Sequence, residues 1–217
     1  MSASFAIVTP RPRLEVLARA PGPVYAEQKL HFAADEEVYA EGGAAQYMYR
    51  LVSGLVRVCG FGAEGRRYID RFYRPGEVFG LEAGAAHEFS AEAVTACVVV
   101  PWRRRVLEAE ALRDAETGRM LLATASNAMA RAQAHARLLA RASAPQKMAH
   151  FLLELTPPGG GELELAMARQ DIADYLGMTI ETVSRTLCLL EREGVIAMPA
   201  ARRIMLVGRA ALEALAG

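Results

Sequence analysis

Four side chains near the C-terminal end of the chain have types and a spacing suited to contacting nucleic-acid bases. Residues at i, i+3, i+4 and i+7 share one face of a helix, and this spacing is shown by Glu181, Ser184, Arg185 and Cys188. An Arg guanidinium can donate to both O6 and N7 of guanine, and a Glu carboxylate can accept from N4 of cytosine. We therefore predict base contacts in the major groove of DNA for Glu181, Ser184 and Arg185.

Two helices are needed to hold that face outward. The pattern predicts a first helix from about Arg169 to Leu176, ended by Gly177 in a left-handed C-cap, and a second helix capped by Thr179. The second helix would bury Val183, Leu187 and Leu190. So short a connection makes the helices cross steeply, which predicts a helix-turn-helix. The alternative is an ordinary amphipathic pair whose charges are only solvated.

Two short strands are expected after this pair, at 195–200 and 204–207, with a basic tip at Ala201, Arg202 and Arg203. This pattern is typical of the wing of a winged helix. Arg202 and Arg203 would meet phosphates there. On the helix pair, contacts with the DNA backbone are predicted for Arg169, Gln170, Thr179 and Thr182.

Cys188 shares the outward face with the predicted base contacts and is a possible redox site. Oxidation of its thiol to a sulfinic or sulfonic acid would place a negative charge beside phosphates. The arginines three residues before and four residues after it, Arg185 and Arg192, would favour the thiolate. Cys59 and Cys97 lie in predicted strands and are expected to be buried. The alternative is that Cys188 is a small neutral side chain without a redox role.

The first half of the chain has the pattern of short strands separated by glycine-rich turns. After an N-terminal extension at 1–28, with a short helix expected before Pro21, residues 29–102 are predicted to form a β jelly roll. Turns are expected at Gly42-Gly43, Gly54, 60–65 and Pro75-Gly76. Strands are expected at 37–39, 47–52, 55–59, 67–72, 77–79 and 93–100.

One long helix is predicted at 103–141, where Ala, Leu, Met, Arg and Glu dominate. A heptad-like stripe predicts that it pairs with a second copy, through Leu121, Ala125, Ala128, Ala132, His135 and Leu139. The alternative is that this stripe packs on the β domain of its own chain. Residues 142–217 form the last predicted domain, with a helix capped by Ser143 through Leu155, a loop at 157–161 and a strand at 162–165. Trp102 is expected to pack where the roll meets the helix.

Composition restricts the class of protein. With 217 residues, 53% of them hydrophobic, the chain has enough apolar side chains for one large or two modest domains. It contains no run of eighteen apolar residues, and its N-terminus does not have the zones of a signal peptide, so we expect a cytoplasmic protein that does not enter a membrane. The net charge of zero predicts that any DNA affinity comes from local placement of charge. Three widely spaced cysteines do not favour a disulfide framework or a metal site.

With a jelly roll, a long helix and a winged helix in that order, the sequence resembles the Crp/Fnr superfamily of bacterial transcription regulators from about Leu30 to the end. The segments 169–177 and 179–185 match the family's helix-turn-helix, and the trio Glu181, Ser184 and Arg185 is similar to that of the Fnr and FixK branches. The cyclic-AMP receptor branch has an Arg where Ile180 stands here. The resemblance implies an α+β fold and a homodimer that binds TTGAT-like inverted repeats in double-stranded DNA and acts with RNA polymerase.

Two departures from the family pattern concern what the roll senses. Oxygen-sensing Fnr proteins carry an N-terminal cysteine cluster for iron and sulfur, whereas no cysteine precedes Cys59 here. Cyclic-nucleotide-binding members grip the phosphate with an Arg, but Gly80-Leu81-Glu82 is followed here by Glu88-Phe89-Ser90. The segment 87–93 is similar to FixK proteins, which act in low-oxygen gene circuits of nitrogen-fixing bacteria without a bound cofactor. We therefore expect no cofactor.

Other functions are weighed against this hypothesis. The roll could bind haem or a small molecule and gate DNA binding, with His31, His87, His135 or His150 as ligands, although structural roles for these histidines are the simpler interpretation. The winged helix could instead bind a protein. An enzyme is not favoured, because the sequence has no Gly-rich phosphate loop after a strand, no HExxH, no GxSxG and no Cys-His arrangement.

Overall fold

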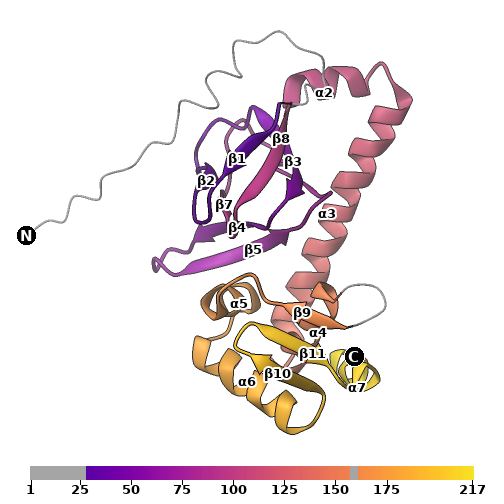
Figure 1. Cartoon of the computed structure of the whole chain (residues 1–217). Coiled ribbons are helices and arrows are strands. Elements are labelled where there is room, and N and C mark those ends of the chain that lie inside the picture. Colours follow the sequence, from indigo (N-terminus) through magenta and orange to yellow (C-terminus); the bar gives the residue numbers. More distant parts are fainter. Residues whose placement is uncertain (1–27, 157–160) are drawn as a thin grey trace, which may run out of the picture.

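The computed structural model describes residues 28–156 and 161–217, and Figure 1 shows its parts. The expected short helix before Pro21 and most of the loop at 157–161 lie outside the described residues. The N-terminal domain is a roll of two four-stranded antiparallel sheets, with strand orders β1-β8-β3-β6 and β2-β7-β4-β5. Its strands are β1 (Leu30–Phe32), β2 (Glu37–Tyr39), β3 (Tyr47–Ser53), β4 (Val56–Phe61), β5 (Arg67–Tyr73), β6 (Val78–Phe79), β7 (Ser90–Ala93) and β8 (Cys97–Arg103). The jelly roll predicted from the sequence is confirmed.

Most expected strands fall within two residues of the observed ones, but the segment 93–100 is corrected. It contains the end of β7 and the start of β8, separated by a turn. The turn is held by Leu55, whose carbonyl accepts from Val94 N at 2.8 Å and whose N–H donates to the Thr95 hydroxyl at 3.0 Å. The β-branched residues Val94 and Thr95 lie in the turn itself and hid it in the sequence. The three-residue strand β1 was also missed.

Gly60 lies inside β4 and does not belong to a turn as expected. A Cβ at this position would stand 2.9 Å from the Tyr68 hydroxyl and 3.1 Å from the Phe89 ring. Glycine is therefore required because the neighbouring strand's aromatic side chain crosses directly over the backbone.

Aromatic side chains fill the interior of the roll. Tyr39, Tyr49 and Phe79 stack with ring centroids 5.3 to 6.1 Å apart, and all three are buried. Aliphatic residues of the facing strands complete the core, including Leu51, Val56 and Val99. These strands contribute large buried surfaces from both sheets, which is the main source of the stability of such a domain.

The helical segment after the roll is two helices, which corrects the single helix predicted at 103–141. Helix α2 (Arg104–Ala111) ends before Asp114, and α3 (Ala115–Arg141) begins after it. Asp114 has an extended backbone, and its carboxylate accepts from both the N–H and the hydroxyl of Thr117 at 2.7 Å. This N-cap starts a new helix and leaves α2 to pack against the first turns of α3. Trp102 packs beside Leu107 and Leu121 where the roll meets these helices, as predicted.

The C-terminal domain places a three-stranded sheet, in the order β10-β11-β9, among four helices. The predicted cap of its first helix is observed, since Ser143 N donates to the Gln146 side chain at 2.9 Å at the start of α4. The elements are α4 (Ala144–Leu155), β9 (Glu162–Glu164), α5 (Arg169–Leu176), α6 (Ile180–Arg192), β10 (Ile196–Ala200), β11 (Arg203–Leu206) and α7 (Arg209–Ala216).

One hydrophobic core joins the two domains. The roll contributes Leu55, Cys59, Ile69 and Phe72 to the cluster that contains the buried residues of α4, α5 and α6. The Phe72 ring lies 5.4 Å from the ring of Tyr175 and 6.5 Å from that of Phe151. Strand β5 therefore packs directly on α5, as Figure 1 shows, and the C-terminal domain is docked on the roll as well as on the end of α3.

Candidate nucleic-acid interface

Helices α5 and α6 form the helix-turn-helix with the predicted bounds. Gly177 adopts the left-handed conformation at φ 61° and ends α5, and Met178 N donates to the Ala173 carbonyl at 2.9 Å. The Thr179 hydroxyl accepts from Thr182 N at 3.2 Å and caps α6. The predicted inward face is also confirmed, since the side chains of Val183, Leu187 and Leu190 are buried.

The opposite face of α6 is open to solvent. Glu181, Arg185 and Cys188 are exposed and Ser184 is half-buried, so the four residues lie on one outward face as predicted. The pKa of the Glu181 carboxyl is lowered by its own backbone N–H, by the Thr179 hydroxyl and by the charge of Arg185. The face therefore presents an ionised acceptor and a guanidinium donor close together, which matches the edges of a cytosine and a guanine.

Ser184 is oriented by a residue of the preceding helix. Arg169 Nη1 donates to its hydroxyl oxygen at 3.0 Å. Because the oxygen accepts this bond, the hydroxyl hydrogen stays available for an acceptor in front of the helix. The sequence indicated both residues as DNA contacts but gave no sign that they touch each other.

The residues predicted to contact the DNA backbone surround this face. They differ in solvent exposure and in the hydrogen bonds that they already make. Thr179 is exposed at the start of α6, and its hydroxyl lies 3.1 Å from that of Thr182. Gln170 is exposed but donates to Asp174 at 2.7 Å. Arg169 is half-buried and engaged with Ser184. Of these four, Arg169 alone is bonded to the other helix of the pair, and Gln170 is bonded within α5.

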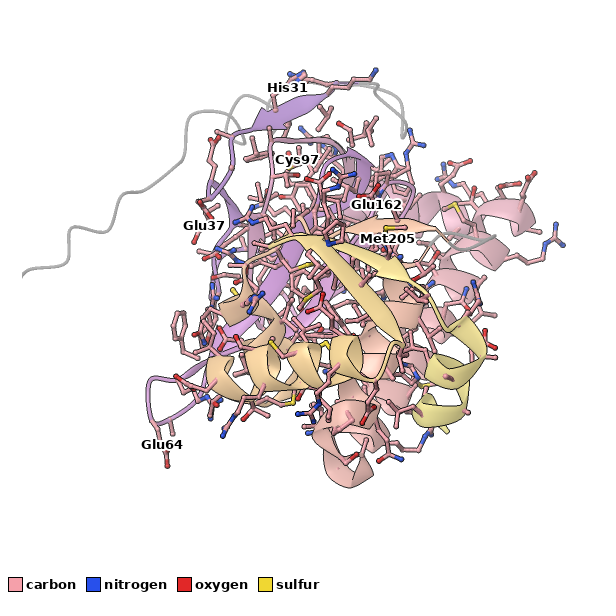
Figure 2. All side chains as sticks on the ribbon, turned by 60° about the horizontal axis from the view of Figure 1, so that its bottom comes forward. His31, Glu37, Glu64, Cys97, Glu162 and Met205 are labelled. Atoms are coloured by element: carbon pink, nitrogen blue, oxygen red, sulfur yellow. The ribbon has the colours of Figure 1, made fainter. Side chains whose placement is uncertain are left out.

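Strands β10 and β11 form the predicted wing, with Ala201 and Arg202 in the turn between them. Arg202 is exposed at this tip. Arg203 is also exposed, but its guanidinium pairs with Glu162 of the neighbouring strand β9. In Figure 2 Glu162 lies beside Met205, which faces it across β9 and β11. Arg202 is thus the tip arginine with no side-chain partner recorded within the described part of the chain, whereas Arg203 is tied to the sheet.

The stripe on α3 that was predicted to join two copies is divided between two faces. Leu121 packs with Trp102 and Leu107, and the His135 ring stacks on Tyr175 with centroids 4.2 Å apart, so both face their own chain. Ala125, Ala132 and Leu139 are exposed, whereas Ala128 is half-buried and lies seven residues from both Leu121 and His135, on the same side as these two. Three large apolar side chains lie on the exposed side, with exposed fractions of 69% for Leu122, 60% for Met129 and 38% for Leu139.

The part of the roll where family members hold a cyclic nucleotide has acidic and aromatic side chains here. His87 Nδ1 lies 3.1 Å from a Glu82 carboxylate oxygen, and the His87 ring stacks on Tyr39 at 3.7 Å. Between Gly80 and Ala93 the sequence holds three glutamates and neither Lys nor Arg. Phe89 packs edge-on against Tyr68. The segment itself supplies carboxylates and no cation, and the arginines that reach it from other elements are Arg104, which donates to the Gly84 carbonyl at 2.6 Å, and Arg57, which pairs with Glu92.

The candidate metal or haem ligands do not gather at one place. His87 and His135 are engaged as just described, whereas His31 and His150 are exposed in separate elements. Among residues 28–156 and 161–217, no group of three His, Cys, Asp or Glu side chains has the arrangement of a metal site. Over the same ranges, none of the helices has the length and apolar character needed to span a membrane.

Helix α5 is held by arginines of the roll. The sequence did not indicate this contact. Asp171 and Asp174 of α5 are buried, and their carboxylates pair with Arg57 of β4 and Arg67 of β5. Arg66 Nη2, from the hairpin between those strands, donates to the Met178 carbonyl in the turn before α6 at 2.9 Å. More than a hundred residues separate these partners, so no local pattern could have indicated them.

Comparisons with known proteins agree with this arrangement. A family model described as a Crp-like helix-turn-helix domain matches residues 146–215, and one described as a cyclic nucleotide-binding domain matches residues 29–114. The nitrogen fixation regulation protein FixK of Azorhizobium caulinodans is 44% identical over 191 residues, which are 85% of this chain and 77% of that protein. FixK of Rhizobium meliloti is 42% identical over 82% of each chain. The solved structure of FixK2 from Bradyrhizobium japonicum superposes with a TM-score of 0.83 and 39% identity, covering 88% of this chain and 97% of that one.

Proposed function

Because the chain belongs to the Crp/Fnr family of transcription regulators, with FixK proteins among its relatives, we propose that it acts as a homodimer on inverted repeats with TTGAT-like half-sites. The observation that carries this proposal is the exposed face of α6. There Glu181, Ser184 and Arg185 stand together on a capped helix whose opposite side is fully buried. We further propose that it works in the cytoplasm with RNA polymerase, and that it needs no cofactor.

Each residue of the face has a proposed partner. Arg185 donates to O6 and N7 of a guanine, and Glu181 accepts from the paired cytosine or its neighbour. Ser184 donates to O4 of a nearby thymine, since its oxygen already accepts from Arg169. Thr179, Thr182, Arg169 and Gln170, with Arg202 and Arg203 of the wing, contact the DNA backbone and set the register without selecting bases.

The dimer would form through the exposed side of α3. Ala125, Ala132 and Leu139 from the predicted stripe alternate there with Leu122, Met129 and Ala136, which gives spacings of three and four along the helix. This is the heptad pattern of a helix that pairs with a twin. Two copies would then place their recognition helices roughly 34 Å apart, one DNA turn, to meet the two half-sites.

Selection of bound duplexes from a random pool tests the base contacts. The wild-type protein should enrich an inverted repeat, and Arg185→Ala should lose roughly 1 to 3 kcal/mol per half-site together with the preference for one G·C pair. Arg209→Ala is the matched control, because this exposed arginine lies on α7 and pairs with Glu213. An unchanged preference in Arg185→Ala would show that another residue selects the base.

Sedimentation tests the dimer. Met129→Glu places a charge in the middle of the proposed seam and should give monomers that no longer bind a full palindrome. Thr124→Glu is not a suitable control, because the Thr124 hydroxyl donates to its own helix and the residue is half-buried. Arg137→Glu also changes an exposed position of α3, outside the apolar pattern, and should remain dimeric. A dimeric Met129→Glu would place the interface elsewhere.

A further inference from the structure

The acidic residues of α5 have partners that come from the other domain. Arg67 donates through Nη2 to Asp171 at 2.5 Å and through Nε to Asp174 at 2.9 Å. Arg57 Nη1 lies 3.3 Å from Asp171. Both carboxylates have side chains only 4% exposed, so water contributes little to their solvation. Without these guanidinium groups the two buried charges would be left uncompensated, which is strongly unfavourable.

The other polar contacts of the two carboxylates do not neutralise them. Asp171 accepts from Ala168 N at 3.2 Å, which caps α5, and Asp174 accepts from the Gln170 amide at 2.7 Å. These donors are uncharged. Burial alone would lower the pKa of the Arg67 guanidinium, but the hydrogen bond that Arg67 donates to Asp174 and the negative charge of Asp171 outweigh burial and raise that pKa. The positive charges that balance α5 therefore belong to β4 and β5. Arg57 is shared with Glu92 of β7, 2.7 Å from its Nε, and with Asp35, so Arg67 is the main cation of α5.

The position of these charges matters for an anionic ligand. Asp171 directly follows Arg169 and Gln170, the residues of α5 proposed to meet DNA phosphates, and Asp174 lies about one helical turn further on. An uncompensated carboxylate so close to a phosphate would repel it, and the electrostatic term dominates the affinity for a duplex. A C-terminal domain without the roll would present this repulsion.

The same hairpin also holds the turn of the helix-turn-helix. Arg66 donates to the Met178 carbonyl at 2.9 Å, and Lys147 of α4 donates to the Leu176 carbonyl at 3.2 Å, so backbone acceptors at the end of α5 are bound from both sides. None of these contacts covers the outward face of α6, where Glu181, Arg185 and Cys188 remain exposed. The docked arrangement is thus compatible with binding a duplex.

We propose that Arg57, Arg66 and Arg67 of the β4–β5 hairpin are positioning residues for DNA binding. Arg57 and Arg67 neutralise the acidic residues of α5, and Arg66 holds the turn after it, so that the roll is part of the DNA-binding unit and does not serve as a sensor alone. This inference rests on the proposed function above. It implies that acidic residues of the C-terminal domain are paired with arginines of the roll. The cations of the C-terminal domain therefore stay available to DNA, although the chain as a whole has zero net charge.

The test is a charge-compensation cycle on the full-length protein, measured as affinity for the selected palindrome over a range of salt concentrations. Arg67→Gln leaves Asp174 without its cation, and we expect affinity to fall at least fivefold and the slope of log affinity against log salt to become shallower by roughly 0.9 per half-site. Asp174→Asn alone removes one of the two carboxylates that Arg67 contacts and leaves Asp171 as the other, so the region becomes more positive and the slope should become steeper. The double variant should return both quantities toward those of the wild type. Arg50→Gln, at an exposed position of β3, is the matched control.

The outcomes separate three possibilities. If Arg67 touched DNA itself, Asp174→Asn would not restore binding to Arg67→Gln. If the pair only stabilised the fold, melting temperatures would change while the salt slopes of both single variants stayed at the wild-type value. Either result would overturn the proposal. A wild-type protein that selects no duplex would contradict the proposed function itself, which is a different failure.

Discussion

The two helices of the helix-turn-helix differ in whether their charged side chains are buried or exposed. In α5 the acidic side chains Asp171 and Asp174 are buried and paired with arginines of the roll, and every residue from Asp171 to Leu176 is buried. In α6 the charged side chains Glu181 and Arg185 are exposed on the side away from the core. The first helix is therefore an anchor between domains, and the second is free to bind an external ligand.

The largest expected effect comes from placing a positive charge on each helix. Asp171→Lys would bury a cation beside Arg57 and Arg67, and we expect the free energy of unfolding to fall by about 3 to 5 kcal/mol, the range for breaking a buried ion pair. Glu181→Lys changes an exposed residue, so the loss should stay within about 0.5 kcal/mol while DNA selectivity changes. Urea denaturation measures both. Equal losses would mean that the two helices do not differ in this way.

The glycines that follow α5 and α6 show whether the two helices also differ in their backbones. Each helix is followed by a glycine in the left-handed conformation, Gly177 at φ 61° and Gly194 at φ 69°. An alanine Cβ would stand 3.6 Å from Leu139 at the first position and in open space at the second. Both Gly177→Ala and Gly194→Ala should therefore cost only the conformational penalty, about 1 to 2 kcal/mol. A much larger loss at Gly177, seen by thermal denaturation, would mean that α3 constrains this turn.

The sequence predicted the helix-turn-helix well because its signals are local. A glycine, a capping threonine and three apolar residues at helical spacing determine both helices within one stretch of chain. Even the outward face could be assigned, since helical periodicity alone fixes which side chains oppose Val183 and Leu187. The fold class was predictable for a similar reason, because short strands and glycine turns alternate along the roll.

The anchoring of α5 could not be predicted, because it depends on contacts between distant residues. Nothing in the local sequence distinguishes Asp171 and Asp174 from acids on a solvated helix face, and their partners lie 104 to 114 residues earlier. Likewise, the composition of 103–141 favours helix throughout, so the break at Asp114 was hidden among helix-forming residues. The spacing on α3 shows which side chains align along the helix but not what each of them contacts. Leu121 and His135, two members of the predicted stripe, pack on the chain's own domains.

A smaller effect is expected at the start of α6. Thr179→Ala removes the hydroxyl that accepts from Thr182 N and should cost about 1 kcal/mol of stability, within the usual range for an N-cap. The corresponding position of α5 is Ala168, which has no capping side chain, and Asp171 accepts from its N–H instead. Ala168→Ser is therefore a useful partner variant, because it adds a capping hydroxyl and should raise stability by up to about 1 kcal/mol. A loss in Thr179→Ala that Thr179→Ser does not recover would contradict the capping role.

The smallest expected effect concerns Cys188, which is exposed on the outward face of α6, whereas Cys59 and Cys97 are buried. Burial raises the pKa of each of those two thiols to about 11, so their thiolates are scarce at neutral pH and peroxide should act mainly on Cys188. A sulfinate or sulfonate at about 7 Å from a phosphate in water opposes binding by roughly 0.6 kcal/mol, close to a threefold loss of affinity per half-site.

The measurement is duplex binding before and after peroxide treatment, in the wild type and in Cys188→Ser. Serine keeps the size and neutrality of the thiol but cannot form a sulfur acid, so this variant should bind DNA equally well in both conditions. A loss of duplex binding in the wild type alone would show that the oxidised group is Cys188 on α6. This result fits the contrast between the exposed face of α6 and the anchored helix α5. Equal losses in both proteins would show that Cys188 has no redox role and is only a small neutral side chain at the edge of the binding face.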